Sequence, residues 1–157
     1  MGIIRFIIGA SACLLIGGAR AEAEGVKVTL IANKVTIQND GAQRLIAATT
    51  AKPGDVILYQ AVYANAGKTK AKNLYATMPI PAGMSFISGS AAPEKAFASL
   101  DGKVFDPIPL KRMVKKSNGA TEEENVPFEE YRFLRWRFSE LPAGDSREVT
   151  AKMLVNN

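Results

Sequence analysis

Hydrophobic and polar residues alternate with a period of two along most of this chain, which is the pattern of β-strands. Residues 26–37 read VKVTLIANKVTI and are followed by the turn dipeptide Asp40-Gly41, and Leu45 begins a short edge piece. The clearest strand covers residues 56–64. Its two faces are both largely apolar, as expected of a strand in the middle of a sheet.

The rest of the chain continues in the same way, with turn residues between short alternating runs. We expect further strands at residues 73–78, 84–87, 96–100, 103–105, 132–138 and 148–155. The runs 96–100 and 103–105 flank Asp101-Gly102, which predicts a tight hairpin. No run keeps a helical period, so we predict an all-β fold, namely an immunoglobulin-like antiparallel β-sandwich of about seven strands.

One internal segment, residues 106–130, lacks any strand period. It contains three prolines, a basic cluster and the acidic run 122–124. A patternless stretch of this length is unusual in a compact domain unless it is a functional or mobile loop. We therefore predict a single β-sandwich domain at residues 26–157, with 106–130 as a long loop insertion. In the strand after it, Leu134, Trp136 and Phe138 share the face expected to lie in the core.

The first 21 residues have the three-part layout of a secretory signal peptide. One positive charge at Arg5 precedes an apolar run at 6–18, and small residues follow, which predicts cleavage after Ala21 or Ala23. The run is too short for a membrane-spanning helix, which needs about 20 residues. The sole cysteine, Cys13, lies inside this run, and a lipid anchor there is disfavoured because Leu14 and the residues after it continue the apolar run. We expect a periplasmic or extracellular protein with no transmembrane helix after signal removal.

The strand pattern is joined by short motifs that resemble a known bacterial family. They are Gly54-Asp55, the alternating Ile57, Tyr59, Ala61 and Tyr63, then Asn65-Ala66-Gly67, Asn73-Leu74 and Ile80-Pro81-Ala82-Gly83-Met84, with Trp136, Leu141 and Ala143-Gly144 toward the end.

Together these motifs resemble the bacterial surface repeat catalogued as domain of unknown function 11. The likeness covers roughly residues 50–155, with 106–130 as an insertion. Met78 stands where the family usually has an acidic residue. The resemblance implies an immunoglobulin-like sandwich on an exported protein, often a spacer or stalk in larger surface proteins. It carries over no catalytic residue, since every matched position has a folding role.

Composition limits the chemistry that the chain can carry out. The chain has no histidine and its one cysteine lies in the signal, which excludes triads that use His as base and Cys/His zinc sites in the mature part. The carboxylate pairs Asp101/Asp106 and Glu129/Glu130 are interpreted as surface charge, because adjacent residues of a strand, such as the two glutamates, point to opposite faces, and the two aspartates flank a turn. Three consecutive glutamates at 122–124 do not match a calcium loop. We expect no enzyme, no metal and no cofactor.

Charge and surface residues point to binding instead. Removing Arg5 and Arg20 with the signal leaves 18 basic against 15 acidic residues, so the mature charge is +3, too small for a nucleic-acid partner. One strand offers a stripe of rings and guanidinium groups suited to a sugar or an anionic polymer. The candidate binding residues are this stripe and the nearby basic cluster: Tyr131, Phe133, Arg135, Arg137, Lys111, Arg112, Lys115 and Lys116.

Two functional hypotheses follow from the sequence. The first is a non-catalytic exported module with a structural or interaction role in the cell envelope or at the surface, with an envelope protein or polysaccharide as partner. The alternative is a carbohydrate- or anionic-envelope-polymer-binding protein that uses the arginine and aromatic stripe.

Overall fold

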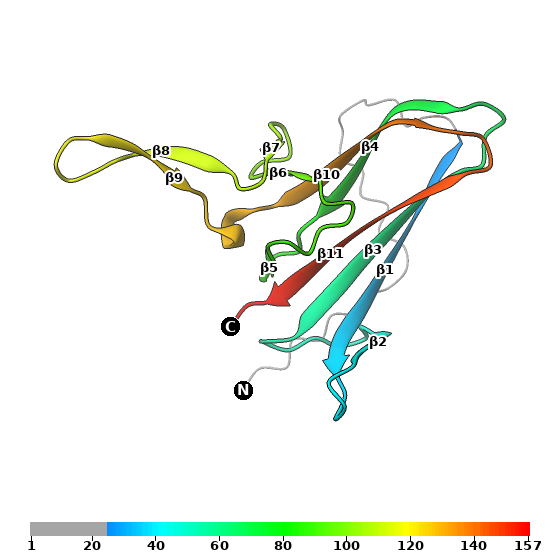
Figure 1. Cartoon of the computed structure of the whole chain (residues 1–157), viewed down its shortest axis with the longest axis horizontal. Helices are drawn as coiled ribbons and strands as arrows, with labels where there is room; N and C mark the ends of the chain where they lie inside the picture. Colours follow the sequence, from blue (N-terminus) through cyan, green and yellow to red (C-terminus); the bar gives the residue numbers. More distant parts are fainter. Residues whose placement is uncertain (1–24) are drawn as a thin grey trace.

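A computed structural model describes residues 25–157, which form two antiparallel sheets and a projecting hairpin (Figure 1). The described residues contain eleven strands, one 3-10 turn and no α-helix, so the all-β prediction is confirmed. The strand number exceeds the roughly seven predicted because the short pairings within 106–125 had no alternating signal. The predicted signal peptide at residues 1–21, its predicted cleavage sites and Cys13 lie outside the described residues.

The larger sheet has five strands in the order β2, β1, β3, β11, β5. Its members are β1 (Val26–Ile37), β2 (Gln43–Ala47), β3 (Val56–Asn65), β5 (Met84–Phe86) and β11 (Ser146–Val155). The central strand β3 pairs antiparallel with β1 on one side and with β11 on the other. This position agrees with the apolar character of both of its faces.

The smaller sheet has four strands in the order β4, β10, β6, β7. Its members are β4 (Ala71–Pro79), β6 (Phe97–Ser99), β7 (Asp106–Pro107) and β10 (Phe133–Leu141). Strand β10 pairs antiparallel with β4 and with β6. No helix in the described part of the chain is both long enough and apolar enough to cross a membrane.

The core lies between the two sheets and is centred on Trp136. This side chain is 1% exposed, and its indole N–H donates to the Pro93 carbonyl over 2.7 Å. Ile57 and Met153 of the larger sheet and Leu134 of the smaller one belong to the same buried cluster. The prediction that Trp136 faces the core is confirmed, and its polar atom has a partner, as buried indoles require.

Two of the motifs that carry the resemblance contain a side chain that links separate parts of the chain. Buried Asn65 donates from its amide nitrogen to the carbonyls of Thr69 and Leu141 and accepts from the Gly67 N–H. It therefore ties the β3–β4 turn to the end of β10. Asp55 accepts from the Lys52 N–H and forms a 2.7 Å ion pair with Lys34 of β1.

The segment 106–130, predicted as a long loop, contains regular structure. It carries β7, a two-stranded hairpin of β8 (Lys111–Lys115) and β9 (Thr121–Asn125), and the 3-10 turn η1 (Phe128–Glu130). The hairpin projects away from the two sheets in Figure 1. Its charged strands lack alternating hydrophobicity because neither face is buried against the core, which is why no strand pattern is visible there.

The Asp101-Gly102 hairpin is also wider than predicted. Phe97 pairs with Pro107 and Ala98 with Asp106, so residues 100–105 form the connection. Asp101 accepts hydrogen bonds from the N–H groups of Lys103 and Val104, and these local bonds fold the connection back on itself. The predicted strand at 103–105 is therefore wrong.

Candidate functional site: an arginine–aromatic cleft on the four-stranded sheet

The outer face of the four-stranded sheet carries the arginines of β10. Trp136 points into the core, so its neighbours Arg135 and Arg137 point to the opposite face. The strand register places Arg137 beside Tyr75 of β4, and Arg135 between Thr77 and Phe97 of β6. Cations and rings from three strands are thus brought to one surface.

These side chains line a cleft of about 540 Å³ on that face. The cleft is lined by Asn73, Tyr75, Phe97, Lys103, Phe105, Arg135 and Arg137. We refer to these seven residues as the arginine–aromatic cleft. They come from β4, β6, β10 and the 100–105 connection, so the wide turn at Asp101 supplies two of them.

Arg135 is positioned by its neighbours at the centre of the arginine–aromatic cleft. Its guanidinium carbon lies 3.4 Å from the centroid of the Phe105 ring and 5.5 Å from that of Tyr75. Its Nε donates to the Thr77 hydroxyl oxygen over 3.0 Å. The guanidinium carbon of Arg137 lies 5.9 Å from the centroid of the same Tyr75 ring. The contact with Phe105 is at stacking distance and holds the Arg135 guanidinium group against the ring.

The electrostatics of the cleft favour an anionic ligand. Its lining includes three cations, Lys103, Arg135 and Arg137, and no carboxylate. Tyr75 is 48% exposed and Phe97 is also exposed, so their rings offer apolar surface to a ligand. A cleft of this kind can pair carboxylate or sulfate groups with guanidinium while a sugar ring stacks on an aromatic face.

The predicted stripe is only partly at this site. Arg135 and Arg137 line the cleft, whereas Phe133 does not. The Phe133 ring packs against Gly102, so closely that a side-chain carbon at that position would lie 2.9 Å from the ring. Tyr131 was wrongly placed on the surface, because it is fully buried and its hydroxyl oxygen accepts from the Leu110 N–H over 2.7 Å.

The environment of Tyr131 explains this correction. Its ring packs against Phe128, with centroids 5.1 Å apart, and against Phe86. Burial raises the pKa of the Tyr131 hydroxyl, and the hydrogen bond with Leu110 opposes this only in part. Tyr131 precedes β10 and follows η1, so the alternation of the strand does not apply to it.

The basic cluster lies on the β8–β9 hairpin, where acidic residues neutralise most of it. Lys111 pairs with Glu123 over 2.5 Å, and Lys116 pairs with Glu124. A hydrogen bond from Lys116 is the largest cause of the lowered pKa of Glu124. The acidic run therefore has a structural explanation in cross-strand ion pairs. In the part of the chain that the structure describes, no three Asp, Glu, His or Cys side chains form a group that could hold a metal.

The remaining predicted basic residues also lie outside the arginine–aromatic cleft. The Nη1 group of Arg112 donates to both carboxylate oxygens of Glu130, at 3.0 and 2.8 Å, and Lys115 is exposed on the hairpin. The hypothesis that the cluster extends the arginine stripe is not supported by its ion pairs, which offset the charge that a ligand would meet.

Sequence reasoning missed five lining residues of the cleft, namely Asn73, Tyr75, Phe97, Lys103 and Phe105. The signal for Tyr75 was available, because it alternates with residues that the strand pattern assigns to the core. Nothing in the sequence places β6 and the 100–105 connection next to β10, because that neighbourhood depends on a pairing across 34 or more residues of chain.

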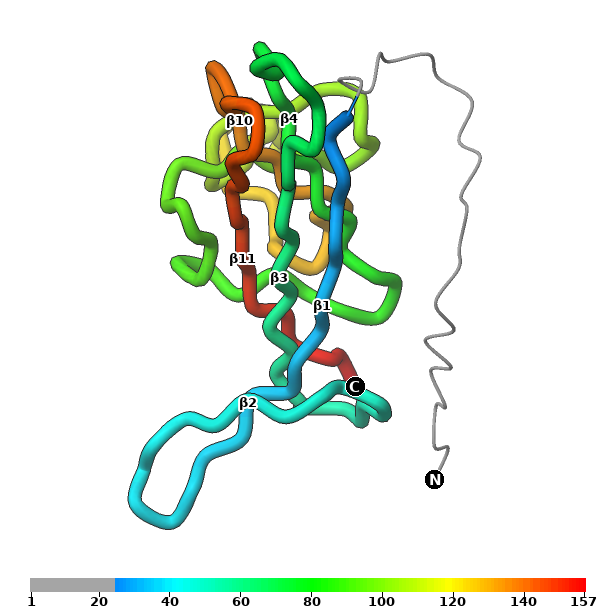
Figure 2. The backbone as a smooth tube through the Cα atoms, turned by 90° about the vertical axis from the view of Figure 1, so that its right-hand side faces the viewer, coloured from blue at the N-terminus to red at the C-terminus, as the bar shows by residue number. Residues whose placement is uncertain are grey.

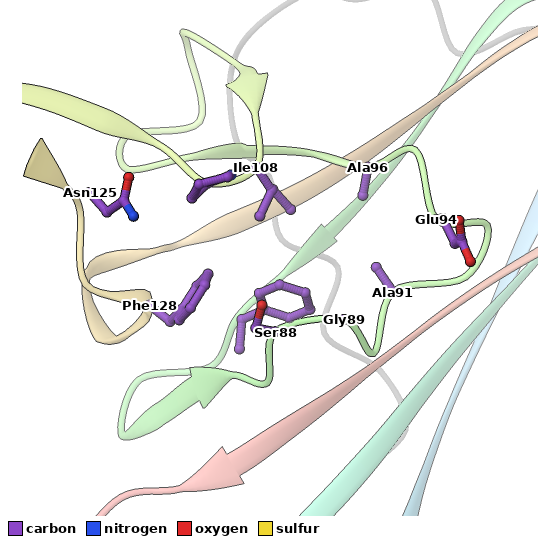
Figure 3. A pocket seen from close by; sticks show the side chains of 10 residues that line it. Ser88, Gly89, Ala91, Glu94, Ala96, Ile108, Asn125 and Phe128 are labelled. Carbon is purple, nitrogen blue, oxygen red and sulfur yellow. The ribbon is translucent and has the colours of Figure 1, made fainter.

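A second cleft, of about 560 Å³, lies between β5, η1 and the 87–96 loop (Figure 3). Phe86, Ile108 and Phe128 form its apolar wall, and Glu94 and Asn125 lie at opposite ends of it in Figure 3. Its polar groups do not converge on one point. The arginine–aromatic cleft is therefore the better candidate for a binding site.

No protein-family model matches this chain, and neither the curated proteins nor the solved structures that were searched include a match to it.

Proposed function

We propose that this chain is a non-catalytic, exported interaction module of the bacterial cell envelope, and that it binds an anionic envelope polymer through the arginine–aromatic cleft. The export signal at residues 1–21 and the motifs that resemble the domain of unknown function 11 support the location. The two antiparallel sheets around one core support an immunoglobulin-like sandwich as the scaffold.

One observation carries the proposal, namely that Arg135 stacks on Phe105 within an open cleft that contains two more cations and no carboxylate. A purely structural spacer requires only a soluble outer face. On such a face, cations and acids are ordinarily interspersed, as they are on the β8–β9 hairpin. In the cleft, cations and rings gather without any carboxylate, and this favours a binding role over a spacer role alone.

The shape of the site indicates the class of ligand. The cleft is open and lies along a sheet face, so an extended chain can pass through it. Guanidinium groups bind carboxylates in a planar, bidentate way, and exposed rings stack on sugar faces. A polysaccharide that carries carboxylate groups satisfies both features, whereas a neutral glycan uses only the rings.

The test is titration of the exported protein with polygalacturonate, with neutral dextran of similar length as the comparison. We expect binding to polygalacturonate that weakens as salt rises, because screening reduces the attraction between exposed charges. The variant Arg137→Gln removes one cation of the cleft and should weaken binding about tenfold, which corresponds to about 1.4 kcal/mol.

The matched control is Arg147→Gln, which removes the same charge from exposed Arg147 on the five-stranded sheet. This variant should bind like the original protein. Equal loss of binding in the two variants would show that only net charge matters. Binding to dextran as strong as to polygalacturonate, or binding to neither, would refute an anionic ligand.

A further inference from the structure

The first half of β1 is an open edge of the five-stranded sheet. Strand β1 pairs with β3 at residues 26–35, but β2 pairs only with residues 33–37. Figure 2 shows β1 at one margin of the sheet, with the β2 hairpin turning away below it. Residues 26–32 thus have a strand neighbour on one side only among the described residues.

Three other edge strands of the two larger sheets, β4, β5 and β7, have features that hinder further pairing. Strand β4 begins after Lys70, carries Lys72, ends at Pro79 and contains Asn73, whose φ of +52° departs from the extended conformation. Strands β5 and β7 are only three and two residues long. Short length, lysine, proline and local bulges are the devices that protect exposed strands. Residues 26–32 read VKVTLIA, contain one charge and have none of the other devices.

The backbone of this open edge is directed outward at three residues. The Gly25 carbonyl accepts from the Ala66 N–H, next to β3, whereas the Ala32 carbonyl accepts from the Ala48 N–H, on the opposite side. Backbone groups of successive residues in a strand alternate in direction. Val26, Val28 and Leu30 therefore present their N–H and C=O groups to the open side.

The same residues also present uncovered apolar side chains. Leu30 lies opposite Ala61 and Val28 opposite Tyr63, both of which are buried in the core. The inner face of the sheet therefore continues onto β1, but Val28 and Leu30 are 55% and 53% exposed. The four-stranded sheet ends at β4 and does not extend over them.

We propose that β1 is a homodimer interface, in which two copies of this chain pair antiparallel through residues 26–30 about a two-fold axis at Val28. This inference does not depend on the proposed ligand. Each copy would contribute the backbone groups of Val26, Val28 and Leu30, and the two five-stranded sheets would become one continuous sheet. A C2 interface of this kind is self-complementary, as two-fold symmetry requires.

The pattern of side chains fits a second copy in this register. Val28 faces Val28 of the second copy, and Leu30 faces Val26, which gives an apolar row on the inner face. The single charged residue, Lys27, faces Thr29 of the second copy, so like charges do not meet. A register with its axis at Thr29 would require the Ala32 carbonyl, which already accepts a hydrogen bond from Ala48.

Sedimentation of the protein over a range of concentrations tests the dimer. We expect a concentration-dependent doubling of mass that Val28→Lys abolishes, because two lysines would then meet on the axis. The matched control is Val104→Lys, since Val104 is a similarly exposed valine of the 100–105 connection. This variant should remain dimeric. Circular dichroism and the melting temperature establish that both variants fold.

Disulfide trapping tests the register and remains informative if Val28→Lys does not fold. In a Cys13→Ala background, Val28→Cys places two thiols opposite each other with Cα atoms about 5.5 Å apart, within disulfide range. Leu30→Cys is the control, because four residues of offset separate its two copies by roughly 15 Å. We expect rapid covalent dimer formation for Val28→Cys and little for Leu30→Cys.

Several results would overturn the proposal. They are a protein that stays monomeric at all concentrations, a dimer that survives Val28→Lys, and equal trapping of the two cysteine variants. A monomer whose β1 binds only a different protein would also overturn it. Loss of dimerisation with unchanged binding to polygalacturonate would separate this interface from the proposed function.

Discussion

Replacement of Asn65 by alanine should strongly destabilise the fold, because a single side chain holds three backbone groups. Asn65 is 2% exposed, and its amide nitrogen donates to the Thr69 carbonyl over 2.8 Å and to the Leu141 carbonyl over 2.9 Å. Its amide oxygen accepts from the Gly67 N–H over 3.0 Å. Alanine removes all three bonds.

The cost can be estimated from these contacts. Each hydrogen bond contributes about 1 kcal/mol net, and a buried group left without a partner costs about 1 to 3 kcal/mol. The bond to the Leu141 carbonyl is buried, whereas the groups in the β3–β4 turn are partly open to water. The total loss for Asn65→Ala is therefore about 3 to 5 kcal/mol, a large share of the roughly 5 to 15 kcal/mol that stabilises a domain.

Urea unfolding followed by circular dichroism measures this loss. With a slope of about 1 to 3 kcal/mol per molar urea, the midpoint of Asn65→Ala should fall by about 2 M. The matched control is Asn118→Ala, because the Asn118 amide oxygen accepts one exposed hydrogen bond, from the Ala120 N–H. It should shift the midpoint little. Equal midpoints for the two variants would refute the reasoning that Asn65 links the turn to β10.

Three further predictions concern the core, the Asp55 ion pair and the hairpin. Trp136→Ala should cost about 3 to 5 kcal/mol by leaving a cavity in the core, measured as a lower melting temperature; an unchanged value would contradict its burial. Burial raises the pKa of Asp55, but the hydrogen bonds from Lys34 and the Lys52 N–H together outweigh this, so the folded pKa lies below the ordinary value of an aspartate. The ion pair of Asp55 with Lys34 therefore stabilises the fold at pH values above the unfolded pKa, and this contribution is lost as the pH falls through the folded pKa. Asp55→Asn should flatten the fall of the urea midpoint that acid causes. An unchanged pH profile would show that the ion pair contributes little. Replacing residues 112–124 by a short Gly/Ser link should leave cooperative unfolding intact, since no residue of that stretch is buried; loss of cooperativity would make the hairpin part of the core.

The sequence was sufficient for features that depend on local chain chemistry. The bounds of β1 at residues 26–37 were predicted from alternation alone, and the all-β class followed from the absence of a helical period. The burial of Trp136 was also predictable, because a strand with alternating arginines has only one face that can enter a core. In each case the information lies within a few residues of the position concerned.

Features that depend on distant pairing were decided only by the tertiary structure. The alternation of β10 sends Arg135 and Arg137 outward, but the register with β4 and β6 brings Tyr75 and Phe97 beside them. Tyr131 was misplaced because the chain bends at η1 just before the strand begins.

The exposure of the first half of β1 also could not be predicted from the sequence. Its sequence is that of a half-buried strand, with Val28 and Leu30 on the face that the pattern assigns to the core. They remain exposed because the second sheet ends at β4, and the number of strands in an opposing layer is not encoded in the strand that it leaves uncovered. A period of two determines which side chains share a face, whereas the packing of whole sheets determines what covers that face.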